Sequence, residues 1–80
     1  MAINLEGQDL RIDRLVCRVE AGRKTWWVLD YKLHPAPHTE PSYCEQLSQY
    51  RRAIARLQPD DEVRCAFVTG QGRLLELQAF

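Results

Sequence analysis

The sequence lacks the features that define several classes of small protein. It has three cysteines among 80 residues, and no two of them form a Cys-x-x-Cys pair. A zinc ribbon or an iron–sulfur site is therefore not expected. Cys17 and Cys65 lie in predicted strands and are expected to pack as small apolar side chains. No apolar run approaches the roughly 20 residues that span a bilayer, and the N-terminus lacks the basic and apolar parts of a secretory signal. We expect a soluble cytoplasmic protein with no membrane partner.

The chain also has no excess of positive or negative charge. Lysine and arginine together number 11, aspartate and glutamate also number 11, and the formal net charge is zero. This balance argues against a free-standing protein that holds nucleic acid by bulk electrostatics, although a site could act while a larger partner holds the substrate. No glycine-rich phosphate loop is present, so these residues are not expected to bind ATP. The 45% hydrophobic and 28% charged residues predict one small globular domain.

Two strands, one helix and two further strands are predicted along the chain. Ala21-Gly22-Arg23 and Gly70-Gln71-Gly72 are typical of hairpin turns, and three of the four prolines mark residues 34–41 as a loop. The helix between the second and third strands would form a right-handed crossover. The prediction is therefore a single α/β domain over residues 1–80, with a mixed sheet of about four strands. The strands are expected at 9–20, 25–33, 63–69 and 73 to 77 or 80, and the helix at 42–58.

The helix has clear signals at both ends. Ser42 and Glu45 match a capping box, and Pro59 marks the end of the segment. Apolar residues at spacings of three and four predict a buried stripe. The stripe consists of Tyr43, Leu47, Tyr50, Ile54 and Leu57.

Polar residues of this helix lie beside the stripe or away from it. Gln46 lies beside it, one turn before Tyr50, and Arg51, Arg52 and Arg56 lie off it. Scattered arginines on a helix usually form a solvated face. Contact with phosphate groups is the alternative interpretation.

The predicted hairpin brings two carboxylates together. If it closes about Ala21-Gly22, Asp13 on the first strand faces Asp30 on the second. Because side chains alternate along a strand, Lys32 shares the face of Asp30. The even positions of the second strand thus turn polar at its end, where a site would open. The odd positions are wholly apolar or aromatic and are expected to face the core; they are Trp27, Leu29, Tyr31 and Leu33.

Opposed carboxylates favour a divalent cation. Like charges directly opposite on a sheet are destabilising by about 0.2–1 kcal/mol, and a cation between them turns that repulsion into binding. Hard carboxylate oxygens favour Mg²⁺, with Mn²⁺ as a substitute, and the backbone carbonyl of Tyr31 could be a further ligand. A cation held by Asp13 and Asp30 beside Lys32 suits phosphodiester hydrolysis. The simpler alternative is that Asp30 and Lys32 form a weak surface salt bridge, which contributes about 0–1 kcal/mol.

The two histidines are weaker candidates for a metal site. His34 and His38 have a spacing that suits metal binding on a helix, but Pro35 and Pro37 prevent a helix there. His34 lies close enough to Lys32 in the sequence to contact a substrate phosphate, and we keep that contact as a hypothesis.

Three segments, in this order, resemble the RecB-type nuclease domain. They are Arg11-Ile-Asp-Arg-Leu-Val16, Trp27-Val-Leu-Asp-Tyr-Lys32 and Gln46-Leu-Ser-Gln-Tyr-Arg51. This domain is a branch of the PD-(D/E)xK superfamily, found at the C-terminus of bacterial helicase–nucleases of the RecB and AddA type. The resemblance extends from about Leu10 to Leu77. It departs from the family pattern at Leu10, where the family commonly has glycine.

The resemblance implies a fold, an activity and roles for individual residues. The fold would be the core of a restriction-endonuclease-like domain, and Asp13 and Asp30 would bind Mg²⁺ while Lys32 is catalytic. Gln46 and Tyr50, with Arg51 beside them, would border the site and contact DNA or support the active residues.

In the family, upstream helices add a histidine or glutamate to the metal site. Glu6 is a poor substitute for that ligand on position alone.

The implied activity is that of a metal-dependent exonuclease acting in DNA recombination and repair. It would belong to the intact protein, of which these residues would form the C-terminal part of the nuclease domain. The expected partners are DNA, the rest of a longer ATP-dependent helicase polypeptide, and a second nuclease or helicase subunit. Two alternatives stay open. The same fold could be a non-catalytic DNA-binding or docking module, or the chain could be a general α/β interaction domain.

Overall fold

A computed structural model describes residues 2–5 and 8–78. It is an α/β fold with a mixed four-stranded sheet and one α-helix among these residues, as predicted. The sheet has the order β3-β4-β5-β6, in which β4 and β5 are parallel and the outer pairs are antiparallel. The elements are β1 (Ala2–Leu5), β2 (Gln8–Arg11), β3 (Arg14–Glu20), β4 (Arg23–Lys32), the 3₁₀ helix η1 (Pro37–Thr39), α1 (Pro41–Leu57), β5 (Glu62–Thr69) and β6 (Leu74–Leu77).

The hairpin register agrees with the prediction along its whole length. Cα partners run from Glu20 opposite Arg23 to Arg14 opposite Leu29. The turn residues Ala21 and Gly22 both have positive φ angles, of 52° and 78°. Two such residues form the turn that matches the natural twist of a hairpin. This turn therefore determines which residues of β3 face which residues of β4.

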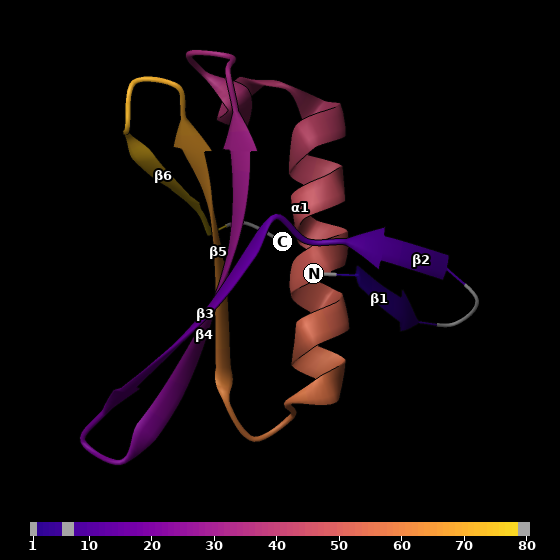
Figure 1. The fold of residues 1–80 in the computed structure, drawn as a ribbon, viewed down its shortest axis with the longest axis vertical. Helices are drawn as coiled ribbons and strands as arrows, with labels where there is room; N and C mark the ends of the chain where they lie inside the picture. The colour runs from indigo at the N-terminus through magenta and orange to yellow at the C-terminus, as the bar shows by residue number, and fades with distance from the viewer. Residues whose placement is uncertain (1, 6–7, 79–80) are drawn as a thin grey trace.

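The first predicted strand is divided, which corrects the expectation of one strand over 9–20. β2 ends at Arg11 and pairs with β1, while β3 starts at Arg14 and belongs to the main sheet. Ile12 lies between them and is fully buried in the core. In Figure 1 the chain crosses at this point from the β1–β2 hairpin, beside α1, to the sheet. The break exists because Ile12 leaves the strand to fill the core.

The helix begins with a proline and not with the predicted capping box. Its N-cap is Glu40, Pro41 occupies the first turn, and no side-chain hydrogen bond closes the N-cap in the described structure. Ser42 therefore lies inside the helix. Proline suits this first position because its missing N–H would have no partner there. At the other end, the Gln58 N–H binds the Ile54 carbonyl, one residue before Pro59.

The even row of β4 faces the core, and the prediction that the odd row does so was wrong. Val28 is fully buried and packs with Leu47 and Phe67, whereas Leu33 in the odd row is 93% exposed. The reason is that α1 covers one face of the sheet, the face on which Val28 pairs with Cys65. The hydrophobic odd row lies on the opposite face.

The two strand cysteines have different environments. Cys65 is fully buried, as predicted, and burial raises the pKa of its thiol to about 12. Cys17, near the far end of the β3–β4 hairpin, is exposed, which the prediction did not anticipate. No helix in the described part of the chain is long and apolar enough to cross a bilayer.

Two leucines of α1 test the position of the core. Leu47 is fully buried and Leu57 is 51% exposed, although the sequence pattern places both in one stripe. We expect Leu47→Ala to lower the free energy of unfolding by about 2–5 kcal/mol. Leu57→Ala, the matched control, should change it by no more than about 0.5 kcal/mol. Urea unfolding followed by circular dichroism measures both, and equal effects would contradict this core.

Candidate active site

The predicted site residues other than Arg51 meet at the carboxyl end of β4, against α1. Asp30 and Lys32 lie on the helix-facing side of β4, and Asp13 comes from the bend between β2 and β3. Gln46 and Tyr50 come from α1. The carboxylates and the lysine thus lie at or beside the ends of strands, and Gln46 and Tyr50 come from the helix that packs against the sheet.

Asp13 is attached directly to β4. Its Oδ2 atom accepts a hydrogen bond of 3.0 Å from the Tyr31 N–H, just beyond the last β3–β4 pair. This hydrogen bond is the main reason that the pKa of Asp13 lies below its ordinary value. The N–H and C=O of one strand residue point to the same side, so the Tyr31 carbonyl also faces the Asp13 side of β4.

Asp30 is the buried member of the pair. It is 3% exposed, and its Oδ2 atom has no hydrogen-bond partner among the described residues. The Lys32 Nζ atom lies 3.2 Å from this oxygen, so the two form an ion pair without hydrogen-bond alignment. Burial is the largest cause that raises the pKa of Asp30. The neighbouring Asp13 carboxyl group is the second cause that raises this pKa, so the two carboxyl groups lie close together.

Lys32 has three partners around its ammonium group. Besides Asp30, it donates to Gln46 Oε1 at 3.4 Å and lies 4.6 Å from the centre of the Tyr43 ring. The structure thus brings Gln46 to the Lys32 ammonium. Tyr43 belongs to the site as well as to the helix stripe, and sequence reasoning missed this role.

Tyr50 lies in the core, and the negative charges of both carboxylates act on its hydroxyl group. The residue is buried. Its pKa is raised above the ordinary value, first by burial and then by the negative charges of Asp30 and Asp13. Tyr50 therefore stays a neutral hydrogen-bond donor at physiological pH, next to the acidic pair.

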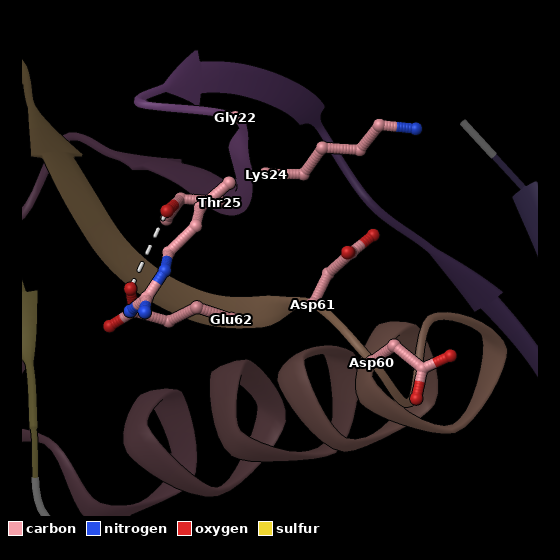
Figure 2. Close-up of a pocket in the computed structure, with 7 residues that line it drawn as sticks. Gly22, Lys24, Thr25, Asp60, Asp61 and Glu62 are labelled. Atoms are coloured by element: carbon pink, nitrogen blue, oxygen red, sulfur yellow. Dashed lines mark hydrogen bonds between the residues drawn. The ribbon is translucent and has the colours of Figure 1, made fainter.

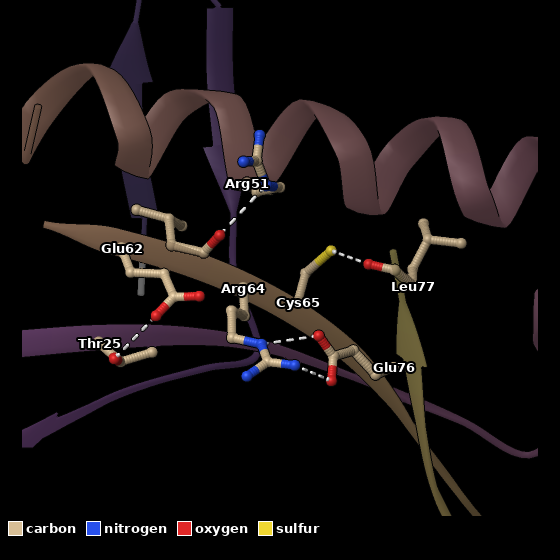
Figure 3. A network of polar contacts seen from close by, with 8 residues as sticks. Thr25, Arg51, Glu62, Arg64, Cys65, Glu76 and Leu77 are labelled. Atoms are coloured by element: carbon tan, nitrogen blue, oxygen red, sulfur yellow. Dashed lines mark hydrogen bonds and ion pairs between the residues drawn. The ribbon is translucent and has the colours of Figure 1, made fainter. Parts of the chain in front are cut away.

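Arg51 lies elsewhere. Its Nε atom donates to the Val63 carbonyl at 3.2 Å (Figure 3). Val63 precedes Phe67, the strand partner of Asp30, by four residues, which is about 13 Å along a strand. Arg51 thus connects α1 to the start of β5, away from the carboxylates, and its contact with DNA stays a prediction.

A second polar network lies across the sheet from Arg51. Arg64 binds both carboxylate oxygens of Glu76, at 2.7 and 2.6 Å, and joins β5 to β6 (Figure 3). The same guanidinium covers the Trp27 ring at 4.9 Å. This network lies on the sheet face opposite α1 and connects three neighbouring strands.

Both histidines lie between β4 and α1, His34 in the loop and His38 in η1. His34 accepts the Ala36 N–H through Nδ1 at 2.9 Å, and its Nε2 lies 3.6 Å from Glu40 Oε1. In the ranges 2–5 and 8–78, no three His, Cys, Asp or Glu side chains gather as a metal-ligand set. Glu6, the weak candidate for an additional ligand, lies outside the described residues.

A cavity lies at the other end of β4, away from the carboxylate pair. It has a volume of about 430 Å³ and lies between the β3–β4 turn and the α1–β5 loop (Figure 2). Two of its acidic residues already have partners. Asp61 accepts the Trp26 Nε1–H at 2.9 Å, and Glu62 accepts the Thr25 hydroxyl at 3.4 Å. These contacts hold the α1–β5 loop to β4, so both acidic residues have a structural role.

No family model matches the chain, and neither a curated protein nor a solved structure is significantly similar to it. The functional interpretation therefore depends on the residues and their geometry.

The raised pKa of Asp30 predicts that this carboxylate destabilises the metal-free protein at neutral pH. A folded pKa above the ordinary 3.8 means that stability falls as pH rises from 3.8 through the folded pKa. We expect Asp30→Asn to raise the free energy of unfolding at pH 7 by up to about 1 kcal/mol, the scale of an opposed like-charged pair. The gain should vanish at pH 3, where Asp30 is neutral in both states.

Urea unfolding between pH 3 and pH 7 measures this effect. Asp60→Asn is the matched control, because Asp60 is an exposed carboxylate in the α1–β5 loop. A variant Asp30→Asn that is less stable than the unsubstituted protein at pH 7 would show that the Lys32 ion pair outweighs burial and repulsion.

Proposed function

We propose that this chain is a metal-dependent DNA nuclease module that hydrolyses phosphodiester bonds. The observation that carries the proposal is the pairing of Asp13 with buried Asp30, whose Oδ2 atom lies beside Lys32 without a hydrogen bond. Two adjacent carboxylates at one strand end are a poor arrangement for stability alone. They become useful when a cation binds them.

The donor set fits Mg²⁺. This ion is commonly held by one or two carboxylates together with waters and substrate phosphate oxygens, and Mn²⁺ can replace it. Asp13, Asp30 and the Tyr31 carbonyl would hold the ion. The lack of a third acidic or histidine ligand among residues 2–5 and 8–78 agrees with a site completed by water and phosphate. When bound, the ion supplies positive charge beside the scissile phosphate and makes water a better nucleophile near neutral pH.

The protein's own residues have separate tasks in this proposal. Lys32 carries a positive charge next to Asp30 and would stabilise the charge that develops on the phosphate oxygens. Gln46 accepts a hydrogen bond from Lys32 and would orient its ammonium group. Tyr50, a buried neutral hydroxyl near both carboxylates, would donate a hydrogen bond at the back of the site.

The wider proposal follows the resemblance of three motifs to RecB-type nucleases. The module would be the exonuclease part of a longer ATP-dependent helicase–nuclease that acts in DNA recombination and repair. Its restriction-endonuclease-like core would receive DNA from the rest of that polypeptide or from a second subunit. The zero net charge supports this division, because a neutral module needs another part to supply affinity for DNA.

Titration with Mg²⁺ tests the metal site without any cleavage. We expect millimolar Mg²⁺ to shift the amide resonances of Asp13, Asp30 and Tyr31 and to leave that of Asp61, at the other end of the fold, in place. At ten times the dissociation constant the ion should stabilise the fold by about 1.4 kcal/mol. Asp30→Asn should abolish both effects. Unchanged spectra at millimolar Mg²⁺ and Mn²⁺ would favour an idle scaffold that docks or binds DNA.

Cleavage of single-stranded DNA by the full-length protein tests catalysis. We expect Asp30→Ala and Lys32→Ala each to lower kcat by about 10²–10³-fold, the effect of removing one group that stabilises transition-state charge. Asp60→Asn should retain activity. If both site variants cleave at the unsubstituted rate while their circular dichroism spectra are native, the assignment is rejected.

A further inference from the structure

The ring of Tyr43 lies directly against the proposed catalytic lysine. Lys32 Nζ is 4.6 Å from the ring centre, within the range of a cation–π interaction. Tyr43 is half-buried in the first turns of α1. It precedes Gln46 by three residues, and residues three apart are neighbours on a helix surface. The two side chains therefore approach the same ammonium group from one helix face.

The three partners of Lys32 differ in what they can do once a cation is bound. The Lys32 ammonium pairs with the Asp30 carboxylate, donates a hydrogen bond to Gln46 and lies over the Tyr43 ring. A cation bound by Asp30 would compete with Lys32 for this carboxylate. Gln46 and Tyr43 carry no charge and would remain available, so they can keep the ammonium at the site.

A further layer of contacts holds the Tyr43 ring in place. The His34 ring meets it edge to face, with centroids 6.1 Å apart and an angle of 86° between the planes. His34 is in turn oriented by the Ala36 N–H, at 2.9 Å, and by Glu40, the N-cap residue of α1. The loop before α1 therefore reaches the site through His34 and Tyr43.

We propose that Tyr43 is a positioning residue whose ring face holds the Lys32 ammonium at the site, with His34 fixing the orientation of the ring. The importance of this contact for catalysis rests on the proposed nuclease function. The contact itself does not.

The first experiment follows the Lys32 side chain by NMR without metal or DNA. The ring current of Tyr43 should shift the Lys32 Hε resonances upfield. We expect Tyr43→Leu to remove this shift and Tyr43→Phe to retain it, because phenylalanine keeps the ring face. The shift should persist when millimolar Mg²⁺ is added. Lys32 resonances that are the same with tyrosine and leucine at position 43 would overturn the proposal.

The second experiment measures cleavage by the full-length protein. We expect Tyr43→Leu to lower kcat by about tenfold with little change in KM, and Tyr43→Phe to restore it. Replacing that phenylalanine with mono- and trifluorinated analogues should lower kcat in steps, because fluorine weakens the negative ring face and hardly changes its size. If Tyr43→Leu lowers kcat but the fluorinated rings do not, Tyr43 has a merely structural role.

Trp27 provides the matched control for these measurements. Its ring also meets a cation, Arg64, at 4.9 Å, but on the opposite face of the sheet. Fluorinating Trp27 should leave both kcat and the Lys32 resonances unchanged. If the protein cleaves no DNA while the resonances respond to Tyr43→Leu, the nuclease proposal fails and the positioning of Lys32 stands. If cleavage requires Lys32 but does not change when position 43 is substituted, the nuclease proposal stands and the positioning role of Tyr43 fails.

Discussion

The hydrogen bond from the Tyr31 N–H to Asp13 is the contact on which the site depends. It lies where the β3–β4 ladder ends, and it brings a carboxylate from outside the strand to the side chain of Asp30. Asp13 is an exposed residue at a bend, and this hydrogen bond is what holds its carboxylate in place. With it, the chain maintains two acidic groups and an ammonium within one small volume.

The same arrangement buries the Asp30 carboxyl group, which destabilises the small core when it is charged. Asp30 is buried between β4 and α1, yet one of its oxygens has no hydrogen bond in the described structure and its neighbour is another carboxylate. An 80-residue domain has little stability to spare, so a residue that favours its neutral form is a burden in the metal-free protein. Such conflicts between local stability and geometry are typical of functional sites.

Local sequence signals were sufficient for part of this account. Ala21-Gly22 determined the hairpin register, and that register correctly placed Asp13 near Asp30. The helix followed from its three-four periodicity, and it brings Gln46 to Lys32 and Tyr50 close to the two carboxylates. The hairpin turn and the helix itself are decided by residues that lie close together in the sequence.

The remaining features depend on tertiary packing and could not be predicted in the same way. Both rows of β4 are rich in large side chains, so only the position of α1 decides that Val28 is inside and Leu33 outside. The break between β2 and β3 depends on the burial of Ile12 in the core, which the local sequence pattern does not predict. Tyr43 has the spacing of a core residue, and its role emerges from the direction in which the Lys32 side chain extends.

The most direct test of the account is a crystal structure of the protein grown with Mn²⁺, with anomalous scattering used to locate the ion. We expect one strong anomalous peak between Asp13 and Asp30, at about 2.1 Å from a carboxylate oxygen of each, with the Tyr31 carbonyl facing it. A structure in which tens of millimolar Mn²⁺ leaves this position without a peak, and Lys32 still paired with Asp30, would contradict it.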